Sequence, residues 1–122
     1  MKAENKFAIV LFLLAACFVP QKVWAHAFPD HSDPKVGATV NGSPNMVKIW
    51  FDSDLEPAFS TLMVHNVNDQ MVDKGNSHVD PNDPTLLEVS VPKLPPGKYK
   101  VIWDVVARDT HRTNGDYSFT VK

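Results

Sequence analysis

Apolar and polar residues alternate along much of this chain with a period of two, and that alternation restricts the fold more than any other feature. It is strongest in four segments of the sequence, 47–51, 87–91, 99–105 and 117–121. In the first of them Val47, Ile49 and Phe51 share one face. Period two with β-branched and aromatic residues is typical of strands with one buried face. A weaker segment over Ser60–Val67 gives a further expected strand.

Turn residues separate the expected strands. The runs 41–44 (Asn-Gly-Ser-Pro), 95–97 (Pro-Pro-Gly) and 114–115 (Asn-Gly) each precede one of them. The polar stretch 66–84 predicts a loop with at most one short irregular strand. Ten prolines among 122 residues disfavour long helices. Together these features predict an all-β fold, a small antiparallel Greek-key β-sandwich or barrel.

Residues 1–25 have the order of an export signal. Lys2 and Lys6 give a short basic start, and an apolar run follows over Phe7–Val19. This run is shorter than the roughly 20 apolar residues that span a bilayer, and no other stretch is more apolar. We therefore predict a signal peptide over 1–25 and one exported, soluble domain over 26–122, without direct membrane insertion.

The charge of the predicted domain limits its partners. Without residues 1–25 the chain has nine basic and thirteen acidic residues instead of twelve and fourteen, a net charge of −4 with histidine neutral. Nucleic-acid binding depends on neutralising phosphates with basic side chains. We therefore expect no nucleic-acid partner, and an acidic surface favours a cationic ligand.

The position of the cleavage site decides the chemistry of His26. A cut after Val23-Trp24-Ala25 makes His26 the first residue, whose α-amine and ring Nδ1 close a six-membered chelate ring on one cation. Leu14-Ala15-Ala16-Cys17 also fits a lipoprotein cleavage box. That cut would lipidate Cys17 and leave His26 internal, without a free amine. A cut just before Phe28 is a third alternative, and the cut before His26 is the preferred one.

A second cluster, Asp109-Thr110-His111, follows the strand expected at 99–105. In a tight turn, an aspartate and a histidine two residues apart can aim at one point. The alternative is a turn-stabilising aspartate beside an exposed histidine. Asp109 and His111, together with His26, offer an amine nitrogen, two imidazoles and a carboxylate. Such a set suits tetragonal Cu(II) first and Ni(II) second, while tetrahedral zinc stays open. The predicted metal ligands are therefore His26, Asp109 and His111, and the predicted ion is Cu(II).

The other candidate donors fit ordinary roles better. His78 belongs to the polar loop, and His65 to an expected strand. His31 follows His26 by five residues and is interpreted as a loop histidine, with an auxiliary or supporting role at the metal left open. The methionines of the predicted domain, Met46, Met63 and Met71, are scattered, which does not favour a Cu(I) site. No hydrolase or phosphate-binding motif is present.

The predicted domain resembles, over its whole length, the CopC family of periplasmic copper-binding and copper resistance proteins. The most specific stretches are Pro96-Gly97-Lys98-Tyr99-Lys100-Val101-Ile102-Trp103, Asp109-Thr110-His111 and Gly115-Asp116-Tyr117-Ser118-Phe119. The resemblance implies a cupredoxin-like or immunoglobulin-like fold in the periplasm. It also implies tight Cu(II) binding through His26, Asp109 and His111, a role in copper tolerance or uptake, and an inner-membrane partner of the CopD type.

Two positions depart from the family pattern. Some members have a glutamate where this chain has Ser53, so a contribution of Asp52, Ser53 or Asp54 to the site stays open. Some members also have a methionine-rich loop, whereas the stretch 66–84 contains only Met71 and His78 as comparable donors. We therefore predict one Cu(II) site and no Cu(I) complex of comparable strength.

The leading interpretation is a copper carrier or buffer and not an enzyme. Its ligands must be deprotonated, so affinity should fall below the ordinary histidine pKa of about 6.5. One alternative is a copper oxidase with a histidine brace, like the lytic polysaccharide monooxygenases. Another is a metal-free β-sandwich interaction module, which requires lipidation at Cys17 or a buried His111.

Overall fold

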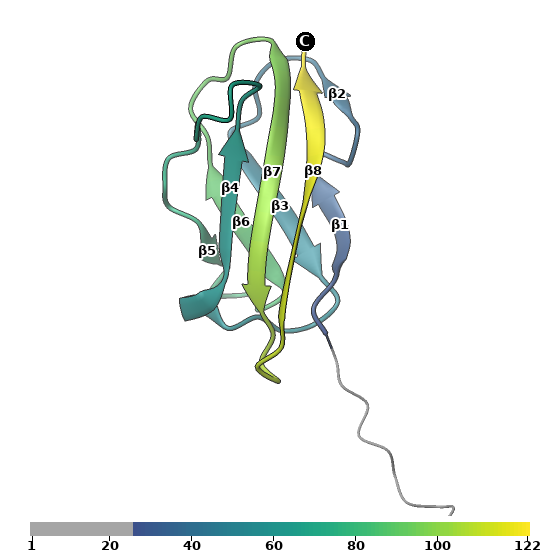
Figure 1. Cartoon of the computed structure of the whole chain (residues 1–122), viewed down its shortest axis with the longest axis vertical. Coiled ribbons are helices and arrows are strands. Elements are labelled where there is room, and N and C mark those ends of the chain that lie inside the picture. The colour runs from purple at the N-terminus through teal and green to yellow at the C-terminus, as the bar shows by residue number, and fades with distance from the viewer. Residues whose placement is uncertain (1–25) are drawn as a thin grey trace, which may run out of the picture.

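The computed structural model describes residues 26–122, and the predicted leader 1–25 lies outside the described residues. Eight strands form two four-stranded sheets (Figure 1). One sheet has the order β1 (Pro29–Asp33), β3 (Met46–Phe51), β6 (Leu86–Ser90) and β5 (His78–Val79). The other has the order β2 (Thr39–Val40), β8 (Arg112–Val121), β7 (Gly97–Val106) and β4 (Thr61–His65). Neighbouring strands are antiparallel, except for β2 and β8, which are parallel. The predicted all-β sandwich is confirmed.

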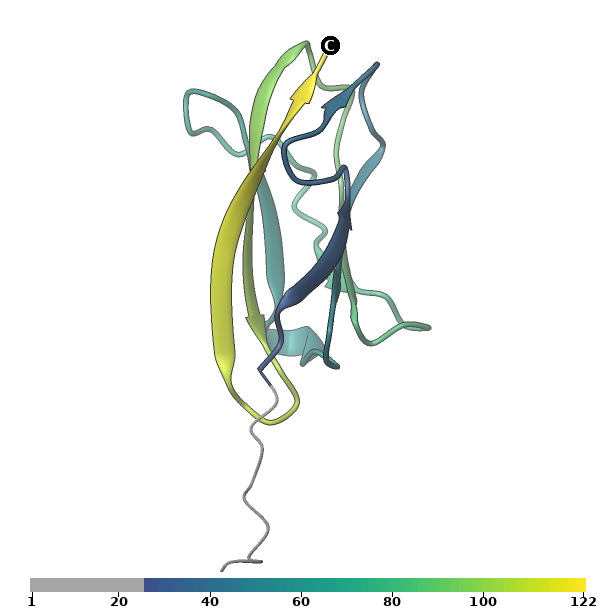
Figure 2. The same cartoon turned by 90° about the vertical axis from the view of Figure 1, so that its right-hand side faces the viewer.

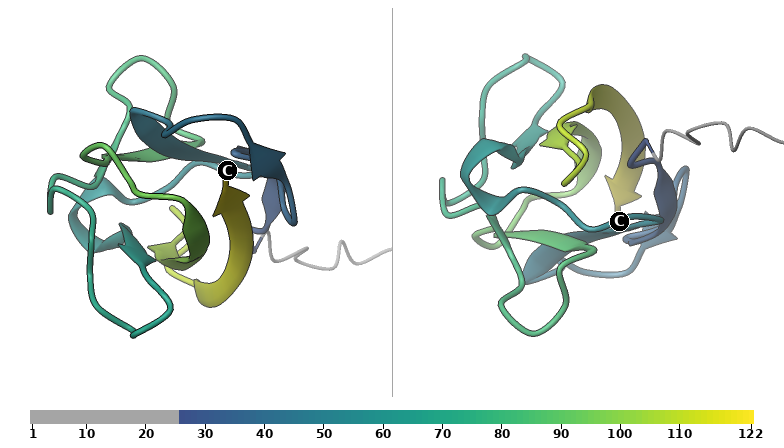
Figure 3. Two further views of the ribbon diagram at one scale, coloured as in Figure 1. Left: turned by 90° about the horizontal axis from the view of Figure 1, so that it is seen from above. Right: turned by 90° about the horizontal axis from the view of Figure 1, so that it is seen from below.

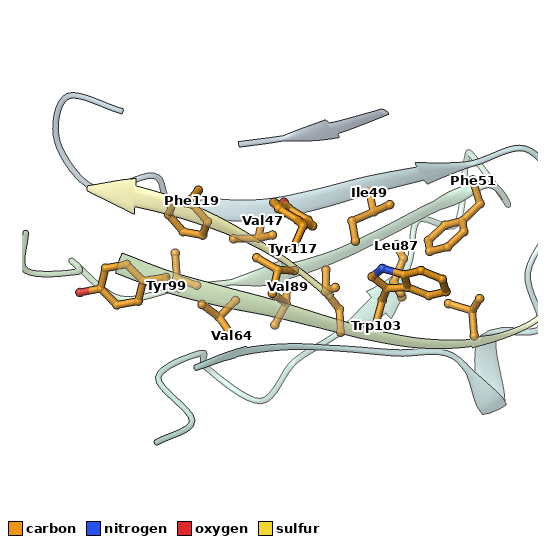
Figure 4. Close-up of a cluster of buried hydrophobic side chains, with 14 of the residues drawn as sticks. Val47, Ile49, Phe51, Val64, Leu87, Val89, Tyr99, Trp103, Tyr117 and Phe119 are labelled. Carbon is orange, nitrogen blue, oxygen red and sulfur yellow. The ribbon is translucent and has the colours of Figure 1, made fainter. Parts of the chain in front are cut away.

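The two sheets face each other across a single apolar core (Figures 3 and 4). In β3 the side chains of Val47, Ile49 and Phe51 point inward and are buried, as the alternation predicts. The ring of Trp103 from β7 packs edge-on against Phe51, with 5.5 Å between ring centroids. Fully burying one such apolar side chain stabilises a fold by roughly 1.5–3 kcal/mol. The inward faces of the predicted strands therefore hold the two sheets together.

Two strands have no clear signal in the sequence. β1 reads Pro-Asp-His-Ser-Asp and is almost wholly exposed, and β2 has only two residues. Both are edge strands of their sheets. An edge strand needs no buried face of its own, so apolar alternation does not reveal it.

The prediction of a turn at Asn114-Gly115 is wrong. Both residues lie within β8, where Asn114 pairs with Asp104 and Gly115 with Trp103 of β7. A Cβ atom at Gly115 would lie 2.5 Å from the Trp103 ring, a distance that real Cβ contacts do not show. Glycine at position 115 therefore leaves room for the Trp103 ring. The reversal between β7 and β8 comes earlier, at 107–111.

The β7–β8 turn and the start of β1 lie at the same end of the sandwich (Figures 1 and 2). A short 3-10 helix over Pro57–Phe59 lies at this end too. None of the helical structure within residues 26–122 has the length and apolar character of a membrane span. The predicted loop 66–84 contains only the short β5 and a bridge between His65 and Met71, as expected.

Candidate metal centre

The turn between β7 and β8 fixes the directions of Asp109 and His111. The main-chain N–H of Ala107 donates to the carbonyl of His111 at 2.9 Å, and that of Thr110 to the carbonyl of Ala107 at 2.8 Å. Thr110 has φ +75°, a left-handed conformation that is rare for a β-branched residue. Asp109 Oδ1 accepts a hydrogen bond from the His111 N–H at 3.1 Å. This turn therefore holds the carboxylate next to the imidazole that follows it.

Both sheets hold the segment that contains His26. Asp52, just after β3, accepts from the Phe28 N–H at 2.8 Å and donates its own N–H to the Phe28 carbonyl at 2.9 Å. The Thr113 hydroxyl of β8 donates to the carbonyl of Ala27, whose side chain is fully buried. His26 is therefore fixed beside the β7–β8 turn, although it is distant from it in sequence.

The structure places His111 next to both of the other predicted ligands, His26 and Asp109. The ring centroids of His26 and His111 are 4.7 Å apart, with 46° between the ring planes. A ring nitrogen binds a metal at about 2 Å, which places the ion about 3 Å from the ring centroid. Two rings on one ion are then separated by about 6 Å at most, and the observed separation is within that limit. Asp109 Oδ1 lies 3.4 Å from His111 Nδ1.

The second carboxylate oxygen, Asp109 Oδ2, is buried and has no hydrogen-bond partner within residues 26–122. A buried polar atom without a partner is costly in a folded protein, and a bound cation would satisfy it. Across the described part of the chain, no group of three or more His, Cys, Asp or Glu side chains is already positioned to hold a metal ion. His26, Asp109 and His111 are therefore neighbours in this structure without forming a complete three-residue metal site.

The segment 52–54 supports both parts of the site through contacts that the sequence alone does not show. The Ser53 hydroxyl donates to the His26 carbonyl at 3.4 Å. The Asp54 carboxylate lies 3.2 Å from Arg108 Nη1, and the Asp54 carbonyl accepts from the Arg108 N–H at 3.1 Å. Asp52 and Asp54 therefore hold the two ligand segments in place, one each. These pairings join residues far apart in sequence, so no local pattern could have indicated them.

The remaining histidines have other neighbours. His31 lies in β1 and not in a loop; its ring stacks on Trp50 at 4.5 Å, and its Nδ1 is 2.8 Å from Asp30. His65 Nδ1 is 3.0 Å from Asp69. His78 faces Glu88 and the Asn76 carbonyl. Their partners are carboxylates, carbonyls and aromatic rings, as expected for residues with structural roles.

Comparisons with known proteins identify the family of this chain. The CopC domain matches residues 30–122. Protein YobA of Escherichia coli K12 is 32% identical over 113 residues, which cover 92% of this chain and 91% of YobA. Copper transport protein CutJ of Bacillus subtilis is 29% identical over 119 residues, which cover 97% of this chain but 22% of CutJ.

Solved structures of copper-related proteins have a similar fold. The crystal structure of CopC from Methylosinus trichosporium OB3b superposes with a TM-score of 0.75 at 31% sequence identity, over 80% of this chain and 94% of that chain. The structure of PcoC from Escherichia coli, described as a methionine-rich copper resistance protein, gives 0.67 at 30% identity, over 80% and 100% of the two chains. This chain has only four methionines.

Proposed function

The chain belongs to the CopC family, and on that basis we propose that it binds one Cu(II) ion through His26, Asp109 and His111. The names of its relatives, copper transport protein and copper resistance protein, support a role in copper handling. The predicted leader supports export, so we place the protein in the periplasm as a copper carrier or buffer.

The observation that carries this proposal is the meeting of two imidazoles 4.7 Å apart beside the Asp109 carboxylate. Two neutral imidazoles and a carboxylate are donors that Cu(II) binds well. The α-amine of His26, free after cleavage, would supply a fourth donor and complete a tetragonal set. With four donors from the protein the ion is held firmly, which suits capture and transfer better than turnover.

Titration with Cu(II) tests the role of the amine directly. One protein begins at His26, and a matched control carries a single glycine ahead of it. We expect the first to bind one equivalent with paramagnetic resonance parameters typical of mixed nitrogen and oxygen donors. The control should bind at least about 10-fold more weakly, because losing one orientation-fixing contact at a metal already costs 10–100-fold. Equal affinity in the two proteins would contradict the chelate.

Mass spectrometry of the protein purified from an exporting host identifies the native N-terminus. A mass that begins at His26 supports the proposal, and an acylated Cys17 would refute it. The same preparation should form no Cu(I) complex of comparable strength, since Met46 begins β3 and Met63 lies in β4 of the opposite sheet. Oxygen consumption with ascorbate should be absent, which separates a carrier from an oxidase.

A membrane partner of the CopD type is the recipient that we propose for the ion. The region of CutJ that matches this chain makes up 22% of that longer copper transport protein. A similar domain therefore occurs joined to further polypeptide in a copper transport protein. That arrangement supports a carrier that works beside a larger transport protein.

A further inference from the structure

A cleft with a volume of about 220 Å³ lies between β1 and β8. Its lining includes Asp30 of β1, Ile49 of β3, Trp103 of β7, and Asp116 and Tyr117 of β8. Figure 2 shows the ribbons of β8 (yellow) and β1 (dark blue), the two strands that border this cleft. None of these residues belongs to the proposed copper site.

The cleft borders a free strand edge. β2 pairs with β8 only at Thr120 and Val121, and the Gly37 N–H donates to the Ser118 carbonyl at 2.8 Å. Over 112–116, β8 pairs with β7 alone, and no described strand covers its other edge. An uncovered edge presents main-chain donors and acceptors that an extended peptide can pair with.

The floor of the cleft is apolar and uncharged. Ile49 is fully buried, and the side chains of Trp103 and Tyr117 are nearly so. Gly115 allows the Trp103 ring to lie close beneath the backbone of β8. Burial raises the pKa of Tyr117 to about 12, and its hydroxyl donates to the Pro34 carbonyl at 2.9 Å. Such a floor can receive the methylene stem of a lysine or arginine, whose charged end stays near water.

The rims of the cleft are acidic. Asp30 and Asp116 are exposed, one on each side, and neither forms an ion pair with a lysine or arginine of residues 26–122. The ion-pair partner of Asp30 among residues 26–122 is a histidine, His31, whose Nδ1 lies 2.8 Å away. The volume is below the roughly 300–1,000 Å³ of pockets for drug-sized ligands. Its size suits one side chain, and its charge suits a cationic one.

We propose that this cleft binds an extended segment of a partner protein. The segment adds as a strand to the free edge of β8 and inserts one arginine or lysine between Asp30 and Asp116. Main-chain hydrogen bonds supply affinity in such strand addition, and the side-chain pocket supplies specificity. Thr113, which holds Ala27, lies three positions before Asp116 in the same strand. A partner in this position would lie beside the proposed copper centre, but its binding requires no copper.

The test uses metal-free, 15N-labelled protein and the capped peptide Thr-Val-Arg-Val-Thr, followed by NMR. We expect peptide-dependent shifts at the amides of 114–118 and at the Trp103 indole N–H. A peptide with glutamate in place of arginine should bind at least 10-fold more weakly. A peptide with N-methylated valines should also lose affinity, because it cannot form the strand hydrogen bonds.

Two variants with the same change of net charge complete the test. Asp116→Asn should weaken binding of the arginine peptide at least 3-fold. Asn82 lies in an exposed turn and does not line the cleft, so Asn82→Lys should leave the affinity for the arginine peptide unchanged. Equal binding of the arginine and glutamate peptides, or equal losses in the two variants, would overturn the cationic pocket. Full binding of the N-methylated peptide would overturn strand addition. Cu(II) titration of the same variants tests the copper site independently, so a failure of peptide binding can be told apart from a failure of the copper proposal.

Discussion

His78 and His111 each lie beside a carboxylate, at 3.0 Å from Glu88 and 3.4 Å from Asp109, but their other neighbours differ. The second ring nitrogen of His78 faces the Asn76 carbonyl at 2.8 Å. Both nitrogens of that ring therefore face oxygen acceptors, which suits a protonated imidazole. His111 instead faces the ring of a second histidine, His26. The contrast teaches that the neighbours of a histidine, protein oxygens at His78 and a second imidazole at His111, distinguish a structural pair from the proposed metal site.

The largest difference should appear when each histidine is removed in turn. We expect His111→Ala to lower Cu(II) affinity at least about 100-fold, because the loss of supporting contacts alone costs 10–100-fold at metal sites. His78→Ala should leave the affinity unchanged. Competition titration with a chelator of known affinity measures both. Equal losses of Cu(II) affinity in the two variants would contradict the assignment of His111, and not His78, as a ligand.

Acid should lower the affinity of the proposed site for Cu(II). Protons compete with copper for imidazoles and amines, so we expect Cu(II) affinity to fall at least about 10-fold between pH 7 and pH 5.5. Chelator competition across this range measures the fall. An affinity that is independent of pH would contradict histidine ligation.

Replacing Asp109 by asparagine should have an intermediate effect. The amide keeps the shape of the side chain and can still accept the His111 N–H, but it brings no negative charge to the metal. We expect Cu(II) affinity to fall about 10-fold, with an unchanged melting temperature of the metal-free protein. Asp104→Asn, in the ion pair with Arg112 on the neighbouring strands, is the matched control and should not alter copper binding.

The smallest effect should come from titration of His78. The hydrogen bond to the Asn76 carbonyl, aided by Glu88, raises the pKa of His78 above its ordinary value of 6.5. Its contribution to stability is therefore complete below pH 6.5 and is lost as pH rises through the higher folded-state pKa. Because the side chain is 45% exposed, we expect less than about 1 kcal/mol. Urea unfolding of metal-free protein at pH 6 and pH 8.5 measures it, and His78→Gln should remove this part of the pH dependence.

The sequence predicts the strands that have a buried face, including the edge strand β4 within Ser60–Val67, and misses the edge strands β1 and β2. β3, β6, β7 and β8 each bury one face, so their alternation is legible in the chain. β1 and β2 are held by pairing with distant strands, which leaves no local pattern. Asn114-Gly115 has the composition of a hairpin turn, yet Gly115 serves the packing of Trp103.

The candidate site divides in the same way. Two parts of the site could be recognised from the sequence: Asp109 and His111 lie only two positions apart, and His26 follows a cleavage motif. The contacts of Asp52, Ser53, Asp54, Arg108 and Thr113 could not, because they depend on how two sheets meet. The sequence analysis left open a supporting role of His31 at the metal, and in the structure this side chain contacts Trp50 and Asp30.

The hydrogen bond between Thr113 and Ala27 joins residues 86 positions apart, and the proposed ion would join His26 to His111 across almost the same length. Such an ion would tie the domain into one large loop, as a disulfide does in many exported proteins. The only cysteine of the chain, Cys17, lies in the predicted leader. Copper would then be a removable cross-link: the loaded domain would resist unfolding and proteolysis, and release of its cargo would loosen it.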